Sequence, residues 1–174
     1  TEIVAGNLKT NFREEVELYL KKKGKVLKDI RAREIKQTDF KRSDIKLKKI
    51  TYTTNVSKEM FLQFITPSKK KHLPNRLLGF LRLSLPNKEN WQKELRQSAI
   101  IREVHVYGPT QPIGKKDIKQ PQHLGLGKKL VNQAINIAKN EEFKKIAVIS
   151  GIGTRKYYEK FGFQKEGLYQ TKKL

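Results

Sequence analysis

Two glycines, Gly125 and Gly127, stand at the start of an apolar-faced helical segment, where residues 122–127 read QHLGLG. Glycines at such a position leave backbone N–H groups bare and let an anion approach the positive end of the helix dipole. This feature predicts a phosphate-binding turn that opens a helix over residues 126–140. Taken alone, the same pair also fits an ordinary turn at the entry to a helix.

Apolar periodicity around this turn predicts an α/β fold with a mixed sheet. Two consecutive strand–helix units imply parallel neighbouring strands, and the glycine turn follows the end of one of these strands. The helix over 126–140 is expected to bury Leu126, Leu130, Ala134, Ile137 and Ala138. Strands are expected over residues 59–66, 77–85, 98–107, 145–150 and 163–170, with shorter ones over 30–35 and 45–49, and a short helix capped by Thr154 over 155–161.

The N-terminal part of the chain is more polar. Residues 7–23 have an apolar residue at every fourth position, which predicts an amphipathic helix that packs on one side. Asn11 and Glu14 fit a capping box at its start, and Gly24 fits the stop at its end. The apolar positions are Leu8, Phe12, Val16 and Leu20.

The balance of charge is strongly basic, with 39 Lys and Arg residues against 17 Asp and Glu residues, a formal net charge of +22. Such a charge repels itself in the compact state, so it indicates a polyanionic partner, and nucleic acid comes first. Lysine enrichment through heat adaptation is the alternative, but Glu would then rise with Lys. Trp91 and Tyr52 can stack on nucleotides. The candidate nucleic-acid contacts are Lys21, Lys22, Lys23, Arg31, Arg33, Lys69, Lys70 and Lys71.

Several classes of protein are excluded by composition. The chain has no cysteine, so disulfides, thiolate metal sites, iron–sulfur clusters and Cys nucleophiles are excluded for these residues. We find no apolar run of the roughly 20 residues that a transmembrane helix needs, and no signal peptide. These observations lead us to expect a cytoplasmic protein without a membrane partner.

Other glycine-rich phosphate motifs do not fit. The strict G-x-G-x-x-G spacing is missing, and Gly127-Lys128 is followed by Lys129 rather than by Ser or Thr. Instead, three segments occur in order: residues 101–108 (IREVHVYG), 122–127 (QHLGLG) and 146–158 (IAVISGIGTRKYY). They resemble the GNAT acetyltransferase superfamily and, more narrowly, the acetyltransferase domain of the Elongator catalytic subunit, which modifies the wobble uridine of tRNA.

This resemblance implies a GNAT fold over residues 51–174, with a mixed central sheet and flanking helices, after a basic N-terminal helical and linker extension over 1–50. It implies acetyl-CoA as cofactor and tRNA as partner. It also implies a radical-SAM domain, supplied in cis in a full-length protein or in trans, and further Elongator-like subunits or a homodimer.

The resemblance also assigns roles to residues. The backbone from Glu103 to Val106 is expected to pair with the pantetheine arm, and Glu103 or His105 to remove a proton. Tyr157 or Tyr158 is expected to hydrogen-bond the thioester or protonate the leaving thiolate, and Tyr157 is the better match. The cofactor-binding candidates are Glu103, Val104, His105, Val106, Gln122, Leu124, Gly125, Leu126, Gly127, Lys128 and Tyr157.

Strand alternation adds a geometric expectation. Ile101, Glu103, His105 and Tyr107 are expected to share one face of their strand, and the other face is expected to carry Arg102, Val104 and Val106.

Two departures from the family pattern stand out. The family carries a radical-SAM domain with a cysteine-ligated cluster upstream, and this chain has neither. Asp29 and Ala32 stand where the family places zinc-binding cysteines, so we expect no metal. A stand-alone protein or lysine N-acetyltransferase and a non-enzymatic RNA-binding module of GNAT fold remain as alternative functions.

Overall fold

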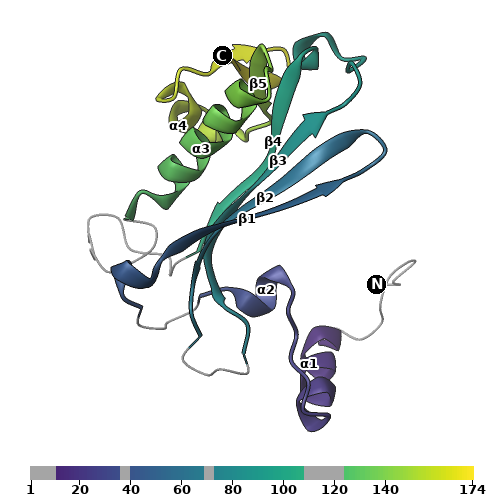
Figure 1. Ribbon diagram of the computed structural model, residues 1–174, viewed down its shortest axis with the longest axis vertical. Coiled ribbons are helices and arrows are strands. Elements are labelled where there is room, and N and C mark those ends of the chain that lie inside the picture. Colours follow the sequence, from purple (N-terminus) through teal and green to yellow (C-terminus); the bar gives the residue numbers. More distant parts are fainter. Residues whose placement is uncertain (1–10, 36–39, 69–72, 108–123) are drawn as a thin grey trace, which may run out of the picture.

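A single twisted sheet organises the molecule (Figure 1). The computed structural model describes residues 11–35, 40–68, 73–107 and 124–174. Within them, seven strands follow the order β1-β2-β3-β4-β5-β7-β6. The strands are β1 (Lys46–Thr53), β2 (Ser57–Thr66), β3 (Arg76–Pro86), β4 (Ser98–Val106), β5 (Lys145–Val148), β6 (Gln164–Glu166) and β7 (Tyr169–Lys173). The helices are α1 (Phe12–Lys22), α2 (Ile30–Arg33), α3 (Leu126–Asn140) and α4 (Arg155–Glu159), and short 3-10 turns cover Arg42–Asp44, Lys93–Leu95 and Ile152–Thr154.

Strand direction divides the sheet into a meander and a crossover. β1 to β4 are antiparallel neighbours, whereas β4 and β5 are parallel and are joined through α3. β7 returns antiparallel to β5, so only the first of the two strand–helix units gives a parallel pair. The single strand expected over residues 163–170 is wrong, because Gly167 at φ +60° turns the chain between β6 and β7.

The main core lies between α3 and one face of the sheet. Leu126, Leu130, Ala134, Ile137 and Ala138 are all buried, which confirms the predicted face of the helix. They pack with alternate residues of β2 and β3, among them Leu62, Leu81 and Leu83. Burial of each such leucine contributes about 2 kcal/mol, so α3 is firmly attached and its N-terminus is held in a defined place.

A β-bulge in β4 changes which side chains share a face. Leu83 pairs with Ile101 and Arg82 pairs with Glu103, so Arg102 is the extra residue of β4. Ile101 therefore lies in the core under α3, on the side against which Val104 and Val106 pack. The expectation that Ile101 shares a face with Glu103 is wrong, because the bulge interrupts the strict alternation.

α1 stands away from the sheet (Figure 1), and none of its residues is buried. Its start lacks the predicted capping box, because the Asn11 side chain makes no cap hydrogen bond. Its end is as predicted: Gly24 has φ +66°, and the N–H of Lys25 bonds to the carbonyl of Leu20. The expected packing of one side is only partial: Val16 and Leu20 are half-buried, whereas Phe12 is exposed, because periodicity shows an apolar face without showing what covers it.

The segment expected as a strand over residues 30–35 instead contains α2. The Asp29 carboxylate accepts a hydrogen bond from the Ala32 N–H at 3.2 Å and pairs with Arg13 at 3.1 Å. Burial raises the pKa of the Asp29 carboxyl, but the Ala32 N–H and the Arg13 guanidinium outweigh it and lower the pKa below its usual value. This N-cap favours a helical turn, which overrides the β-branched residues of the segment. The expected division of the chain at residue 50 stays a prediction, and β1 runs through that residue.

Candidate functional site

The sheet opens between β4 and β5. The two strands pair only from Ser98 to Ile101 and from Lys145 to Val148. β4 then continues to Val106 while β5 ends. On this side, the backbone after Ile101 has no strand partner among the described residues, so it can pair with an extended ligand.

The N-terminus of α3 lies next to this opening. Gly125 is the N-cap residue, with φ +65°, and no side chain caps the helix among the described residues. The backbone N–H groups of Leu126, Gly127 and Lys128 have no acceptor within the helix. The first turn contains no acidic residue. This is the arrangement that a helix uses to hold a phosphate.

Three segments meet at Gly127. A Cβ atom placed on Gly127 would lie 2.8 Å from the Tyr157 hydroxyl and 3.6 Å from Cγ2 of Val106. The helix N-terminus, the free end of β4 and the side chain of α4 are therefore in contact here. Because a side chain at residue 127 would displace the Tyr157 hydroxyl, glycine keeps the space beside that hydroxyl open.

The two adjacent tyrosines have different surroundings. Tyr157 is 36% exposed, and burial raises the pKa of its hydroxyl, so this group is a neutral hydrogen-bond donor near neutral pH. Tyr158 is 7% exposed and packs against Phe163, with ring centroids 5.7 Å apart. Burial, with a smaller effect from Tyr157, raises the pKa of Tyr158 to about 12. Of the two, only Tyr157 lies beside the glycine turn.

A buried amide that sequence reasoning missed holds α4 in place. The Gln170 side chain, 3% exposed, accepts from the Ser150 hydroxyl at 2.9 Å and donates to the Arg155 carbonyl at 3.3 Å. It thereby joins the end of β5, the start of α4 and β7. The expected side-chain cap by Thr154 is wrong, because its hydroxyl donates to the Gly151 carbonyl instead.

The candidate bases lie on the face of the sheet opposite α3. Glu103 pairs with Arg82 at 3.8 Å, and both side chains are nearly half exposed. The His105 ring stacks on Phe80 at 6.0 Å and contacts Tyr107 at 4.5 Å. Burial raises the pKa of the Tyr107 hydroxyl, and the carboxylates of Glu34 and Glu103 raise it further. The sheet thus separates the carboxylate and imidazole from the α3 turn, with the opening between β4 and β5 joining the two sides.

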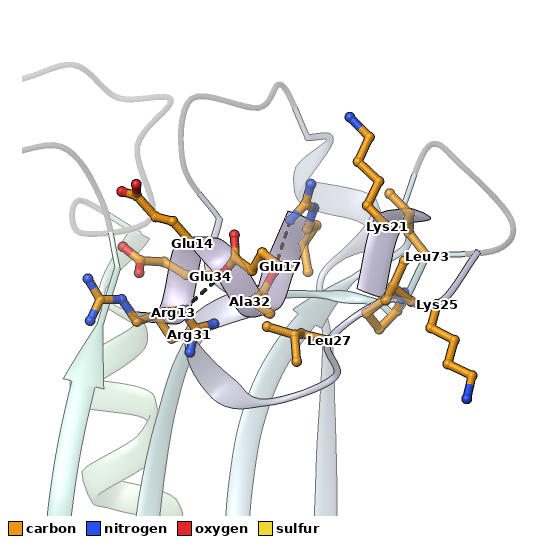
Figure 2. Close-up of a pocket in the computed structure, with 13 residues that line it drawn as sticks. Arg13, Glu14, Glu17, Lys21, Lys25, Leu27, Arg31, Ala32, Glu34 and Leu73 are labelled. Carbon is orange, nitrogen blue, oxygen red and sulfur yellow. Dashed lines mark hydrogen bonds and ion pairs between the residues drawn. The ribbon is translucent and has the colours of Figure 1, made fainter. Parts of the chain in front are cut away.

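The basic candidates fall into two groups. Lys21, Lys22, Lys23 and Arg31 are exposed. Lys21 and Arg31 line a cavity of about 660 Å³ between α1, α2 and the start of β3 (Figure 2). In Figure 2 the ammonium groups of Lys21 and Lys25 extend away from each other, and Glu14, Glu17 and Glu34 bring negative charge to the same cavity.

Arg33 is engaged within the fold. Its guanidinium donates to the Gln63 side-chain oxygen at 2.6 Å and to the Asn75 carbonyl at 3.1 Å. It therefore attaches α2 to the sheet and is poorly placed to contact a phosphate. The candidates Lys69, Lys70, Lys71 and Gln122 lie outside the described residues. Among the described residues, no group of three or more His, Cys, Asp or Glu side chains is placed to hold a metal ion.

Comparison with known proteins agrees with this geometry. A family model, the acetyltransferase (GNAT) family, matches residues 118–163. Elongator complex protein 3 of Schizosaccharomyces pombe is 35% identical over 180 residues, covering 99% of this chain and 32% of that protein. The tRNA uridine(34) acetyltransferase of Methanocaldococcus jannaschii is 39% identical over 186 residues, covering 100% of this chain and 33% of that protein. A solved structure of the archaeal Methanocaldococcus infernus Elp3, with its N-terminus deleted, has a TM-score of 0.78 at 37% identity and covers 99% of this chain and 41% of that chain.

The chain contains a GNAT acetyltransferase domain. The resemblance drawn from the three sequence segments is thereby confirmed, together with the predicted GNAT fold. The chain spans about a third of the length of the curated relatives it matches. None of the helices in the described part of this GNAT chain has the length and apolar character that crossing a membrane requires.

Proposed function

We propose that this chain is the acetyl-CoA-binding acetyltransferase domain of an enzyme that modifies the wobble uridine of tRNA. The observation that carries the proposal is the meeting of Gly127, Val106 and Tyr157 at the opening between β4 and β5. The curated relatives named tRNA uridine(34) acetyltransferase, which this chain matches over its whole length, support the choice of reaction.

The described residues fit acetyl-CoA. The N–H groups of Leu126, Gly127 and Lys128, beside Leu124 and the N-cap Gly125, would hold the pyrophosphate at the positive end of α3. The unpaired backbone from Glu103 to Val106 would bind the amide groups of the pantetheine arm as a neighbouring strand does. When bound, acetyl-CoA supplies an acetyl group activated as a thioester.

Side chains at the opening would act from both faces of the sheet. The Tyr157 hydroxyl would donate a hydrogen bond, or a proton, to the sulfur or oxygen of the thioester. Glu103 or His105 would accept a proton from the opposite face. Tyr158 does not reach this space, so we assign it to the support of Tyr157 through their edge-to-face contact at 5.3 Å.

The wider context of the enzyme is also part of the proposal. We infer tRNA as the substrate, a radical-SAM domain in cis or in trans, and Elongator-like subunits or a homodimer as partners in the cytoplasm. The exposed Lys21, Lys22, Lys23 and Arg31 would contact tRNA phosphates, together with Lys69, Lys70 and Lys71, which lie outside the described residues. Within this scheme, residues 51–174 would form the acetyltransferase unit and residues 1–50 its basic extension.

Isothermal titration with acetyl-CoA tests the proposal. The wild-type chain is expected to bind, and Gly127→Trp is expected to lose binding because the ring fills the phosphate turn. Gly127→Ala, a milder change, displaces the Tyr157 hydroxyl and is expected to weaken binding. Gly151→Ala is the matched control, because nothing lies within 4 Å of the added Cβ atom.

The titration, together with an RNA-binding measurement and a peptide acetylation assay, separates the alternative functions. A folded wild-type chain that binds RNA but shows no heat with millimolar acetyl-CoA would be a non-enzymatic RNA-binding module. Robust acetylation of peptides without tRNA would favour the stand-alone protein acetyltransferase. Either result would overturn the proposed function.

A further inference from the structure

The sheet face opposite α3 carries polar and aromatic side chains in register across four strands. Tyr52 of β1 pairs with Glu59 of β2, Glu59 pairs with Ser84 of β3, and Ser84 pairs with Ile100 of β4. These four side chains therefore form one row across the sheet. The next row toward the end of β4 contains Arg82 and Glu103.

Glu59 is held in a fixed orientation within this row. Its Oε1 atom accepts hydrogen bonds from the hydroxyls of Ser57 and Ser84, both at 2.6 Å. Ser57 and Ser84 are 4% and 6% exposed, so these two bonds are shielded from water. The other carboxylate oxygen, Oε2, has no hydrogen-bond partner among the described residues, which leaves an oriented acceptor for an N–H donor.

A cavity of about 620 Å³ lies over this row. Trp91, the only tryptophan of the chain, lines it and is 84% exposed. Tyr52, 47% exposed, lines the same cavity. These two large aromatic side chains lie outside the core clusters and line one cavity, so they offer surfaces on which a base can stack.

Positive charge surrounds the cavity and connects it to the candidate base. Arg82, Lys88 and Arg102 line it, against the carboxylates of Glu59 and Glu89, and Arg82 also pairs with Glu103. The bulge at Arg102 places this arginine beside Glu103 on the same side of the sheet. A ligand in the cavity would therefore lie next to the space that Glu103 faces.

We propose that this cavity binds an unpaired RNA base, stacked on Trp91, with an N–H group of the base donating to Glu59 and an adjacent phosphate on Arg102. This proposal rests on the proposed function, because the cavity would bind the RNA on the side of the sheet from which it reaches the opening between β4 and β5. An acidic peptide fits the cations, but its carboxylates supply neither a nucleobase ring to stack on Trp91 nor an N–H group to donate to Glu59.

The single tryptophan makes stacking directly measurable. Addition of single-stranded oligouridylate is expected to quench Trp91 fluorescence and protect the ring from acrylamide. An abasic oligonucleotide of equal length, which keeps the phosphates, is expected to cause little quenching. Absence of quenching by oligouridylate, or equal quenching by the abasic strand or by polyglutamate, would overturn the proposal.

Variants provide a second readout. Trp91→Ala is expected to weaken oligouridylate binding, measured by anisotropy of a labelled strand, by at least about fivefold. Ile152→Ala, which removes another highly exposed apolar side chain (80% exposed) that does not line this cavity, is the matched control and is expected to bind as the wild type does. Unchanged affinity of the Trp91→Ala protein would contradict the proposal.

A titration with acetyl-CoA shows whether a negative result contradicts this proposal or the proposed function. Trp91→Ala is expected to bind acetyl-CoA as the wild type does, because Trp91 lies on the other side of the sheet from the α3 turn. If the wild type fails to bind acetyl-CoA while oligouridylate still quenches Trp91, the proposed function fails and the base-binding cavity stands. If Trp91→Ala loses acetyl-CoA binding as well, the separate cavity is refuted.

Discussion

At the scale of single residues, neighbours in sequence have different roles because a helix turns by 100° per residue. Tyr157 reaches the Gly127 turn, whereas Tyr158 points into the core beside Phe163. A pattern of two tyrosines shows that one is available for chemistry, and only the packing of α4 shows which one.

Burial of Tyr158 gives a testable dependence of stability on pH. Its pKa is about 12 in the folded chain, against 10.0 for an exposed tyrosine, so the unfolded chain releases this proton first. The contribution of the protonated Tyr158 hydroxyl to the free energy of unfolding is complete below pH 10 and is lost as the pH rises toward 12. Urea unfolding at about pH 9 and about pH 11.5 should show this loss, at most about 3 kcal/mol. Tyr158→Phe should show a smaller loss over the same interval, and an equal loss would contradict the assignment.

We expect glycine to be needed at position 125 only because of its backbone conformation. Its φ of +65° is unfavourable for other residues, and nothing lies within 4 Å of an added Cβ atom. Gly125→Ala should therefore lower the free energy of unfolding by about 1–2 kcal/mol through backbone strain. Gly151→Ala, equally open and without a positive φ, should leave stability nearly unchanged. Denaturant unfolding of both variants measures the difference.

At the scale of elements, attachment to the core differs strongly between helices. α3 buries seven residues, whereas α1 buries none. α2 also buries no residue, but it is attached to the sheet through the Arg33–Gln63 hydrogen bond. Helices that lack buried contacts open locally before the whole domain unfolds.

Hydrogen exchange should show this difference between α1 and α3. Amides of α1 are expected to exchange by local opening at rates close to those of an isolated short helix. Amides in the middle of α3 are expected to exchange only with global unfolding. Protection of α1 equal to that of α3 would show that another surface covers its apolar side chains, Phe12, Leu18 and Tyr19 among them.

The contact of α2 with the sheet can be tested by a double-mutant cycle. Gln63 is 1% exposed, and its Nε2 atom already has no hydrogen-bond partner within the part of the chain that the structure describes. Arg33→Ala would leave its oxygen unpaired too, at a cost of about 1–3 kcal/mol. Gln63→Leu in the same chain should recover most of the loss, because no buried polar group then remains. Arg31→Ala is the control on the same helix, and its exposed side chain should matter little to urea unfolding.

For the whole molecule, the net positive charge dominates the expected attraction of polyanions such as RNA. The net charge of +22 is spread over both the extension and the sheet domain. It raises the local concentration of polyanions at any surface of the chain, so a single basic cluster cannot be assigned as the RNA site by charge alone.

The salt dependence of RNA affinity can locate the phosphate contacts. The logarithm of affinity for single-stranded RNA should fall linearly with the logarithm of salt concentration. Lys21, Lys22 and Lys23 replaced together by Ala should reduce the slope by up to about 2 units, at about 0.7 per lost contact. The triple variant of Lys144, Lys160 and Lys165 to Ala removes equal charge from exposed positions beside β5, after α4 and in β6. α4 and β5 lie at the opposite end of the molecule from α1 (Figure 1). An equal change in both would show that α1 has no special part in RNA binding.

Local sequence patterns predicted many of the helices and strands correctly. The buried face of α3, the strands β2, β3 and β4 and the stop at Gly24 all follow from periodicity and glycine position, because these signals depend on residues close together in the chain. The predictions were wrong where two local signals disagreed. The Asp29 cap favours the helix α2 where β-branched residues indicated a strand, and Gly167 turns the chain within the expected last strand.

The order of residues along the chain is enough to predict an α/β domain with a glycine turn before α3, a strongly basic charge balance and the three ordered segments of a GNAT acetyltransferase. Which groups meet depends on the folded arrangement. It brought Gly127, Val106 and Tyr157 together, moved Ile101 away from Glu103 through the bulge at Arg102, and aligned Tyr52, Glu59 and Ser84 below Trp91. The reason is physical: spacing along the chain sets helices and glycine turns, whereas contacts between distant segments depend on strand register and packing, which no single segment contains.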